Sequence, residues 1–332
     1  MTGLPGRQRV LSGMRPSGRL HLGHLHGALH NWIELQEEFD CFYFVADWHA
    51  LTSEYGDTSG LKQSGFDMIV DWLAAGIDPE KTTLFVQSRV IEHAELNLIL
   101  SMITPLGWLE RCPTYKEQLE QVKGKDLHTF GFLGYPVLQT ADIIMYRADW
   151  VPVGVDQVPH IELSREIVRR FAQFYGGGIF PEPQPKLTRF AKIPGTDGRK
   201  MSKSYGNAIF LSDSEEETEK KIRPMVTDPA RVRRTDPGDP EKCPVFTLHK
   251  VYTPEGGHGE LVEGCRTAGI GCLDCKKVLI GHLNEALRPL RQRRQELASD
   301  PERVWRIMDE GSEKALVEAR RTMERVRAAL KL

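Results

Sequence analysis

Apolar and polar residues alternate in a regular order along the first half of the chain. Short apolar runs predict strands, and they lie at residues 10–13, 41–46, 83–86 and 150–153. The unbroken run at 41–46 is typical of a strand buried on both faces of a parallel sheet. Apolar residues recur at helical spacing from Gly23 onward, and residues 60–75 also have a helical pattern. Strands that alternate with helices predict an α/β fold, a doubly wound parallel sheet with its site at the carboxyl ends of the strands.

The pattern changes beyond Gly206. The segment Ser212-Asp213-Ser214-Glu215 combines N-cap residues with acidic residues, which favours a helix that begins there. Segments 276–298 and 301–331 are charged and amphipathic, with few β-branched residues in succession. We therefore expect two domains, an α/β domain over residues 1–206 and a helical domain over residues 207–332.

Composition places the chain among ordinary globular proteins. Its 332 residues are 40% hydrophobic and 27% charged, with a formal net charge of -2. No apolar run is long enough to cross a bilayer and the N-terminus lacks the apolar core of a signal peptide, so we expect a cytoplasmic protein with no membrane partner. The low net charge excludes blanket binding of nucleic acid, which leaves local arginine patches as candidates. Two such patches, each of which also fits a solvated helix face, are Arg231, Arg233 and Arg234, and Arg288, Arg291, Arg293 and Arg294.

Two short motifs far apart in the chain carry candidate phosphate chemistry. Lys200-Met201-Ser202-Lys203-Ser204 places two lysines three positions apart in a glycine-flanked loop, a cationic clamp for the charge that builds on a pyrophosphate leaving group. His21-Leu22-Gly23-His24 follows a predicted strand and turn, where a helix N-terminus directs its N–H groups at phosphate. Either motif alone is weak evidence, because histidines also cap helices and a Lys/Ser loop is usually just solvated.

Together, in this order, the two motifs resemble those of class I aminoacyl-tRNA synthetases. Further segments are similar to tryptophanyl-tRNA synthetases, and they lie at residues 11–18, 135–143, 151–157 and 159–163. The resemblance implies a Rossmann-like catalytic domain and an α-helical anticodon-binding domain. It implies a ligase that joins L-tryptophan to ATP as tryptophanyl-adenylate, with Mg²⁺ bridging the phosphates, and releases pyrophosphate. The acyl group then passes to the 3′ end of tRNA(Trp), and the family implies a homodimer.

The spacing of one segment indicates an amino-acid pocket. Pro136 suits the first turn of a helix, and Tyr135, Gln139 and Asp142 then share one face. An indole N–H is a donor only, so a lone carboxylate acceptor such as Asp142 complements it. The resemblance adds Tyr135 and Gln157 as residues that hold the substrate ammonium. The full tryptophan set that we expect is Asp142, Tyr135, Gln157, Gln139, His49 and Val153. Without the neighbouring motifs, a helix cap or an internal salt bridge would be the preferred interpretation of Asp142.

The family pattern also maps an ATP site onto this chain. The resemblance implies catalytic roles for His21, His24, Lys200 and Lys203. The ATP-binding residues that it implies are Arg15, Pro16, Ser17, Gly23, His24, Gly154, Val155, Asp156, Ile193, Lys200, Met201, Ser202, Lys203 and Ser204. Asp156 offers acceptors to ribose hydroxyls, Ile193 is expected against adenine, and Gly13, Gly23 and Gly154 allow a close backbone approach. The chain departs from many relatives in keeping both histidines and in having Arg15 where Gln is common, so the residue that contacts the triphosphate stays open.

Four of the six cysteines are clustered, as Cys243-x21-Cys265-x6-Cys272-x2-Cys275. Structural disulfides are rare in the cytoplasm, so a metal site is the first hypothesis. One CxxC with two irregularly spaced partners suits a [4Fe–4S] cluster, whereas a structural Zn²⁺ site more often shows two CxxC pairs. The spacing also resembles that of a subset of tryptophanyl-tRNA synthetases with such a cluster. Zinc and unligated thiols remain as alternatives.

Three other functions fit part of the pattern. A tyrosyl-tRNA synthetase shares the fold, but a phenol both donates and accepts, and the stretch 151–154 offers an apolar wall that favours indole. A synthetase-like regulatory protein without catalysis would be expected to lack lysines or glycines of the two motifs. A general nucleotidyltransferase would not need the helical second half.

Overall fold

A five-stranded parallel sheet forms the centre of the computed structural model, which describes residues 6–332 except 114, 117–118, 120–125 and 188–192. The strand order is β3-β2-β1-β4-β5, and every pair is parallel. The strands are β1 (Arg9–Met14), β2 (Asp40–Val45), β3 (Thr82–Val86), β4 (Trp150–Val153) and β5 (Gln184–Leu187). The four predicted strands and the doubly wound α/β fold are confirmed. The short edge strand β5 was not predicted, since its polar, proline-containing sequence lacks an apolar run.

Alternate residues of β2 separate the two faces of the sheet. Cys41, Tyr43 and Val45 pack on α2 (His30–Glu38) and α4 (Leu61–Ala75). Phe42 and Phe44 pack on the opposite face, against α5 (Glu92–Ser101), α8 (Phe130–Met145) and α9 (Val158–Tyr175). All six residues of β2 are buried, as expected of a central strand with helices on both sides.

The helix after β1 is not regular. It begins as α1 (Leu22–His24), widens into the π-helical turn η1 (Leu25–Leu29) and continues as α2. The described residues of the first half also form α3 (Asp47–Glu54), α6 (Leu106–Glu110) and the 3₁₀ turns η2 (Gln87–Arg89) and η3 (Val155–Gln157). The prediction for Pro136 was wrong. Helix α8 begins at Phe130, where the side chain of Thr129 accepts from the N–H of Phe132, so Pro136 lies inside the helix.

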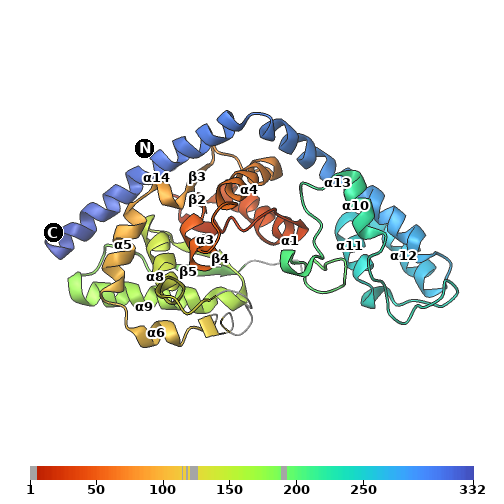
Figure 1. Cartoon of the computed structure of the whole chain (residues 1–332), viewed down its shortest axis with the longest axis horizontal. Helices are drawn as coiled ribbons and strands as arrows, with labels where there is room; N and C mark the ends of the chain where they lie inside the picture. The colour runs from red at the N-terminus through yellow and green to blue at the C-terminus, as the bar shows by residue number, and fades with distance from the viewer. Residues whose placement is uncertain (1–5, 114, 117–118, 120–125, 188–192) are drawn as a thin grey trace.

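The second half is helical, as predicted. After the 3₁₀ turn η4 (Lys203–Tyr205), its helices are α10 (Glu215–Ile222), α11 (Pro244–Tyr252), α12 (Glu255–Arg266), α13 (Cys272–Ala298) and α14 (Pro301–Leu330), with a 3₁₀ turn η5 (Pro240–Lys242) before α11. Ser214 and Glu217 form a capping box that starts α10, which confirms the predicted N-terminus. Figure 1 shows α10, α11 and α12 on one side of the molecule, with α13 and α14 arching over its top.

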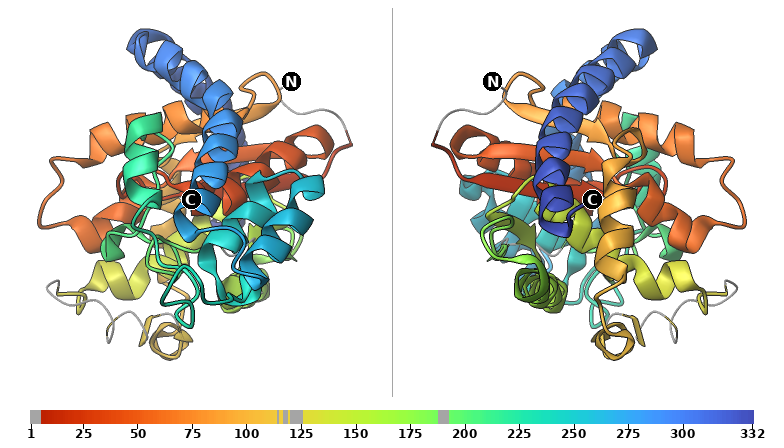
Figure 2. Two further views of the ribbon diagram at one scale, coloured as in Figure 1. Left: turned by 90° about the vertical axis from the view of Figure 1, so that its right-hand side faces the viewer. Right: turned by 90° about the vertical axis from the view of Figure 1, so that its left-hand side faces the viewer.

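The final helix α14 returns to the sheet and covers its β3 edge. Its first half contributes Val304 and Met308 to one apolar cluster, and its second half contributes to the other. At the crossing, a Cβ on Gly311 would overlap the carbonyl oxygen of Leu84 in β3. The next residue, Ser312, accepts a 3.4 Å hydrogen bond from the N–H of Val86, so the helix also satisfies one backbone donor at this edge of the sheet. The end-on views in Figure 2 show this helix crossing beside the strands.

Several arginines of the two candidate patches are tied into the fold. Arg293 donates to the carbonyl of Ala74, and Arg294 pairs with the buried Asp71, so both fasten α13 to α4. Arg231 is buried, with hydrogen bonds to the carbonyls of Arg234 and Ile270. These three side chains are internal cross-links. In the described residues, no helix is both long enough and apolar enough to cross a membrane.

Candidate active site

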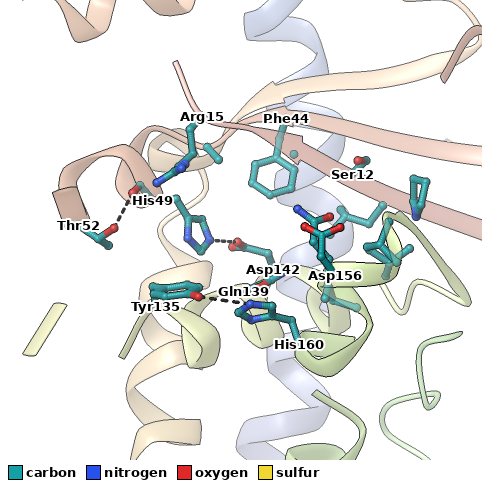
Figure 3. A pocket seen from close by; sticks show the side chains of 18 of the residues that line it. Ser12, Arg15, Phe44, His49, Thr52, Tyr135, Gln139, Asp142, Asp156 and His160 are labelled. Carbon is teal, nitrogen blue, oxygen red and sulfur yellow. Dashed lines mark hydrogen bonds and ion pairs between the residues drawn. The ribbon is translucent and has the colours of Figure 1, made fainter. Parts of the chain in front are cut away.

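A cavity of about 310 Å³ opens at the carboxyl ends of β1 and β4. Helices α3 and α8 and the turn before α9 form its other walls. All six residues of the expected tryptophan set line this cavity: His49, Tyr135, Gln139, Asp142, Val153 and Gln157. Arg15 and Asp156, both expected to bind ATP, line it as well (Figure 3). The position is the one predicted for a ligand on a doubly wound sheet.

One face of α8 carries three of these residues. Tyr135, Gln139 and Asp142 all line the cavity, so the helical spacing predicted their common direction. Sequence reasoning missed several other lining residues, among them Phe44, Thr52, Phe132, Val151 and His160. These come from five separate elements and share no local motif, and the apolar ones carried only the signal of core residues.

Asp142 is the floor of the cavity and is 1% exposed. Its Oδ1 accepts from His93 Nδ1 at 2.6 Å and from Gln87 Nε2 at 2.8 Å. Its Oδ2 accepts from His49 Nε2 at 2.7 Å. Burial by itself raises the pKa of Asp142, but the hydrogen bonds from His49 and His93 outweigh it and hold the pKa below its usual value. The carboxylate is therefore charged and lines the cavity from a buried position.

Two partners of Asp142 were not predicted. Gln87 follows β3 and His93 lies in the first turn of α5, and both are fully buried. His93 Nε2 lies 2.7 Å from the hydroxyl of Tyr146, so donation from Nδ1 to Asp142 leaves Nε2 to accept from the phenol. Because Gln87 and His93 hold Asp142 from the side away from the cavity, the same carboxylate accepts internal hydrogen bonds and faces the cavity.

The histidine motif caps its own helix. His21 Nδ1 accepts from the N–H of Gly23 at 3.1 Å, and His24 Nδ1 accepts from the N–H of His21 at 3.2 Å. Burial lowers the pKa of His21 to about 4, with Lys203 adding to the effect, and burial with His21 lowers the pKa of His24 to about 3. Both rings are thus neutral near pH 7. Because each Nδ1 accepts, the ring proton lies on Nε2, which is left to donate to a ligand.

Lys203 joins the second motif to the turn after β1. Its ammonium donates to the carbonyl oxygens of Ser17 at 2.9 Å and Gly18 at 3.2 Å. Burial and the nearby Arg15 lower the pKa of Lys203. Lys200 is exposed and acts electrostatically on His21, so both lysines lie near the histidine motif. The two motifs, far apart in sequence, meet in space.

The remaining ATP candidates divide between the surface and the core. Asp156 lines the cavity with its side chain exposed, and Val155 beside it is exposed. Ile193 and Met201 are buried, and the N–H of Met201 donates to the carbonyl of Ile193 at 3.3 Å. Ser202 is fixed by the side chain of Asn207, which accepts its N–H at 2.8 Å. Gly154 is buried, while Pro16 and Ser17 form the turn on which Lys203 rests.

Comparisons with known proteins give the family. The family "tRNA synthetases class I (W and Y)" matches residues 5–288. The chain is 56% identical to a tryptophan–tRNA ligase of Thermotoga maritima over 98% of this chain and 99% of that one, and 47% identical to one of Ralstonia nicotianae over 98% of each. The chain belongs to the tryptophan–tRNA ligases. The expected class I synthetase fold and tryptophan–tRNA ligase activity are thereby confirmed.

A solved tryptophanyl-tRNA synthetase of Campylobacter jejuni, complexed with ADP and tryptophan, has the same fold. It is 37% identical, with a TM-score of 0.90, and the alignment covers 98% of this chain and 100% of that chain. The structural match therefore includes both the sheet and the helices that follow it.

In this tryptophan–tRNA ligase, Gly13 and Gly23 are needed for a reason other than the one expected from the sequence. A Cβ on Gly13 would overlap the ring of Phe44, and one on Gly23 would stand 2.9 Å from the ring of His21. Both positions exclude a side chain because a neighbouring ring fills the space. The close approach of backbone to nucleotide, proposed from the sequence, does not by itself account for them.

The four clustered cysteines come from three helices of the second half. Cys243 precedes α11, Cys265 lies in α12, and Cys272 and Cys275 lie one turn apart at the start of α13. All four are free and half-buried. Burial raises the pKa of Cys275 to about 12, and the nearby Cys243, Cys265 and Cys272 raise it further. Among the described residues, no group of three or more His, Cys, Asp or Glu side chains is arranged to hold a metal ion.

Proposed function

We propose that this ligase binds L-tryptophan in the cavity at the carboxyl ends of β1 and β4, with ATP between the histidine motif and the lysine loop. The observation that carries the proposal is the convergence of all six expected tryptophan residues with Arg15 and Asp156 on one cavity. The relative from Campylobacter jejuni, whose structure holds ADP and tryptophan, supports it.

The amino-acid site follows from the donors and acceptors in the cavity. Asp142 accepts the indole N–H, and the apolar side chains of Phe44, Val151 and Val153 contact the ring. Asp142 Oδ2 already accepts from His49. The indole N–H therefore either shares this acceptor or replaces His49. In the second case the His49 side chain moves when substrate binds. The residues placed around the substrate ammonium are Tyr135, Gln139 and Gln157.

The reaction is an in-line attack of the tryptophan carboxylate on the α-phosphorus of ATP. The C–O–P bond forms as the bond to pyrophosphate breaks, and an ionised carboxylate needs no general base, so positioning and charge stabilisation supply the rate. The neutral His21 and His24 donate Nε2–H bonds to phosphate oxygens. Lys203 leaves the carbonyls of Ser17 and Gly18 for the leaving pyrophosphate, where Lys200 joins it. Mg²⁺ enters with ATP and bridges its phosphates.

The nucleotide contacts are assigned to the remaining candidates. Asp156 accepts from the ribose hydroxyls, and Arg15 and the Pro16-Ser17 turn face the triphosphate. The backbone of Gly23, Gly154, Val155, Ile193, Met201, Ser202 and Ser204 completes the site. A hydroxyl of the terminal adenosine of tRNA(Trp) then attacks the adenylate carbonyl and releases AMP.

We also propose that the active form is a cytoplasmic homodimer with catalytic residues 1–206 and tRNA-binding residues 207–332, of which α14 packs back on the sheet. Support for the dimer comes from large apolar side chains exposed around α5, α6 and the start of α8. They are Ile91, Leu98, Met102, Leu106 and Phe130, between 57% and 79% exposed. A monomer rarely exposes so many apolar side chains on neighbouring elements.

For the cysteines we propose a structural [4Fe–4S] cluster held by Cys243, Cys265, Cys272 and Cys275. Four soft thiol donors suit iron–sulfur chemistry. Burial raises the pKa of Cys265, and Arg231, whose Nη1 lies 3.8 Å from Cys265 Sγ, partly offsets that effect. Bound by these four thiolates, a cluster would cross-link the start of α11 to α12 and α13. Four thiolates around one Zn²⁺ are the alternative.

Metal analysis tests the cluster. Anaerobically purified protein is expected to be brown and to contain about four iron atoms per chain. Cys272→Ser should lose iron and stability while largely retaining tryptophan activation, and Cys112→Ser, outside the group, should keep its iron. Stoichiometric zinc with negligible iron would replace the cluster by the zinc site.

Amino-acid-dependent exchange of pyrophosphate into ATP tests the active site. Run with each of the twenty amino acids, the assay should respond to tryptophan alone. A comparable response to tyrosine, or a response independent of amino acid, would contradict the assignment of Asp142 and its cavity.

A further inference from the structure

A second cavity, of about 450 Å³, lies at the end of the sheet opposite the active site. It opens beside the first residue of β1 and the residue before β4, where the turn after α8 meets the second half of α14. Its charged lining residues are Arg7, Arg9, Arg147, Arg321, Arg325, Asp149 and Glu318. Five arginines and two carboxylates leave three positive charges in excess, and none of these residues belongs to the active site.

The two carboxylates are already engaged. Glu318 accepts from Arg9 Nη2 at 2.9 Å and also pairs with Arg321. Asp149 accepts the backbone N–H of Arg9 at 2.8 Å. In the part of the chain that the structure describes, no carboxylate forms an ion pair with Arg7, Arg147 or Arg325. Three guanidinium groups therefore face the same cavity without a paired carboxylate.

Arg147 also has an unusual backbone. Its φ is 54°, in the left-handed region, just beyond the end of α8. Glycine is the common residue at this position after a helix, and a side chain there costs conformational energy. The N–H of Arg147 donates to the carbonyl of Ile144 as it would from a glycine. A strained arginine in a turn that suits glycine indicates that the side chain has a use.

The Arg147 side chain is not needed to hydrogen-bond the carbonyl groups at the end of α8. A positive charge near a helix C-terminus is favourable, but the last carbonyls of α8 have other donors. Thr322 Oγ1 donates to Met145 at 2.7 Å, and Arg9 Nη1 donates to Tyr146 at 3.0 Å. Burial lowers the pKa of Arg147, and the nearby Arg325 and Arg9 lower it further, against a smaller opposing effect of Asp149. The positive charges around Arg147 therefore change its pKa more than the negative charge of Asp149 does.

We propose that this arginine cavity binds a multivalent oxyanion of the phosphate class. Guanidinium groups bind phosphate through paired, planar N–H donors, and Arg147 and Arg325 approach the cavity from the turn after α8 and from α14. A bound anion joins those two elements at the amino end of the sheet. Its source is either a free inorganic anion or a phosphate of a polynucleotide backbone.

Pyrophosphate binding to the full-length protein tests the site. Tryptophan and α,β-methylene ATP first fill the active site, and calorimetry then measures added inorganic pyrophosphate. Wild-type protein should bind one pyrophosphate per chain, and the double variant Arg147→Gln, Arg325→Gln should bind it at least about tenfold more weakly. The control double variant Arg303→Gln, Arg306→Gln removes the same charge from exposed positions on α14 outside the cavity and should bind as wild type does.

The variant Arg147→Gly separates a binding role from a structural one. Without anion, its melting temperature should equal or exceed that of wild type, because glycine relieves the strained φ. With pyrophosphate, it should lose the rise in melting temperature that wild type shows. A lower melting temperature without anion, or equal pyrophosphate binding in all variants, would overturn the proposal.

RNA binding identifies the source of the anion. If the ligand is a backbone phosphate, the Arg147→Gln, Arg325→Gln variant should also bind tRNA more weakly, and its log–log salt slope should fall by about two. If the ligand is a free anion, tRNA affinity stays unchanged while pyrophosphate binding is lost. In either case the rate of adenylate formation should equal that of wild type. No saturable binding of pyrophosphate or RNA at these residues would refute the site.

Discussion

Replacing Asp142 by Asn tests the central feature of the pocket, a buried carboxylate that accepts from three side chains. The amide keeps the shape but exchanges one acceptor oxygen for a donor. His49 can adapt by changing tautomer, but Gln87 and His93 approach from the protein side. Both donate to Oδ1, and Gln87 Nε2 also donates to Oδ2 at 3.0 Å. The substituted side chain therefore offers the indole N–H a weaker, neutral acceptor or none.

The size of the effect follows from the charge of the acceptor. A hydrogen bond to a charged group contributes about 1.5–3 kcal/mol, so kcat/KM for tryptophan should fall about 10- to 150-fold. The KM for ATP should change less than about twofold, since no nucleotide candidate contacts Asp142. Steady-state pyrophosphate exchange measures both constants, and a thermal melt shows whether the variant is folded.

A substrate analogue sharpens this test. β-(Benzothiophen-3-yl)alanine has sulfur in place of the indole N–H and so cannot donate to Asp142. Wild type should discriminate against it, and Asp142→Asn should show little discrimination, because the two changes remove the same hydrogen bond. The matched variant Asp156→Asn should instead raise the KM for ATP. Equal losses for tryptophan and ATP in Asp142→Asn, or additive losses with the analogue, would refute the proposed role.

Three further predictions concern the lysine loop, the histidine motif and α14. Lys203→Ala should lower the rate of adenylate formation about 10²- to 10³-fold in single-turnover assays, with tryptophan affinity unchanged in equilibrium dialysis. In the unfolded chain, His21 and His24 bind protons below about pH 6.5. In the folded chain they bind protons only near pH 4 and below. The free energy of unfolding should therefore fall as the pH is lowered from about 6.5 to about 4. Urea titrations should show a smaller fall in the His21→Asn, His24→Asn variant. Gly311→Ala should cost about 1–3 kcal/mol or more in the same titrations, since its Cβ would meet the carbonyl of Leu84; an unchanged midpoint would contradict this packing.

The sequence predicted those parts of the site that are local. Tyr135, Gln139 and Asp142 follow one helical period, and the two phosphate motifs are contiguous, so the order of residues along the chain is enough to infer their directions. The partners of Asp142 could not be inferred in this way. Gln87 and His93 lie in other elements, and their relation to Asp142 exists only once β3, α5 and α8 pack together.

The same limit explains the misplaced start of α8. Proline is common in the first turn of a helix, and that preference pointed to Pro136. The helix instead begins at the cap provided by Thr129, in an apolar stretch where periodicity alone does not fix an end. The elements that α14 packs against could not be predicted either. Its amphipathic pattern shows that one side is buried, but it does not show which elements cover that side.

The packing of Gly311 in α14 against β3 has a consequence for synthesis of the protein. A ribosome completes all five strands long before α14 emerges, so the backbone of β3 stays open to other chains during that interval. A nascent chain in this state offers the kind of strand edge that chaperones cover and that aggregates extend. A fragment cut at residue 206 would lack α14 and keep this edge uncovered. Synthesis of α14, and not completion of the strands, is therefore the point at which the β3 edge is covered.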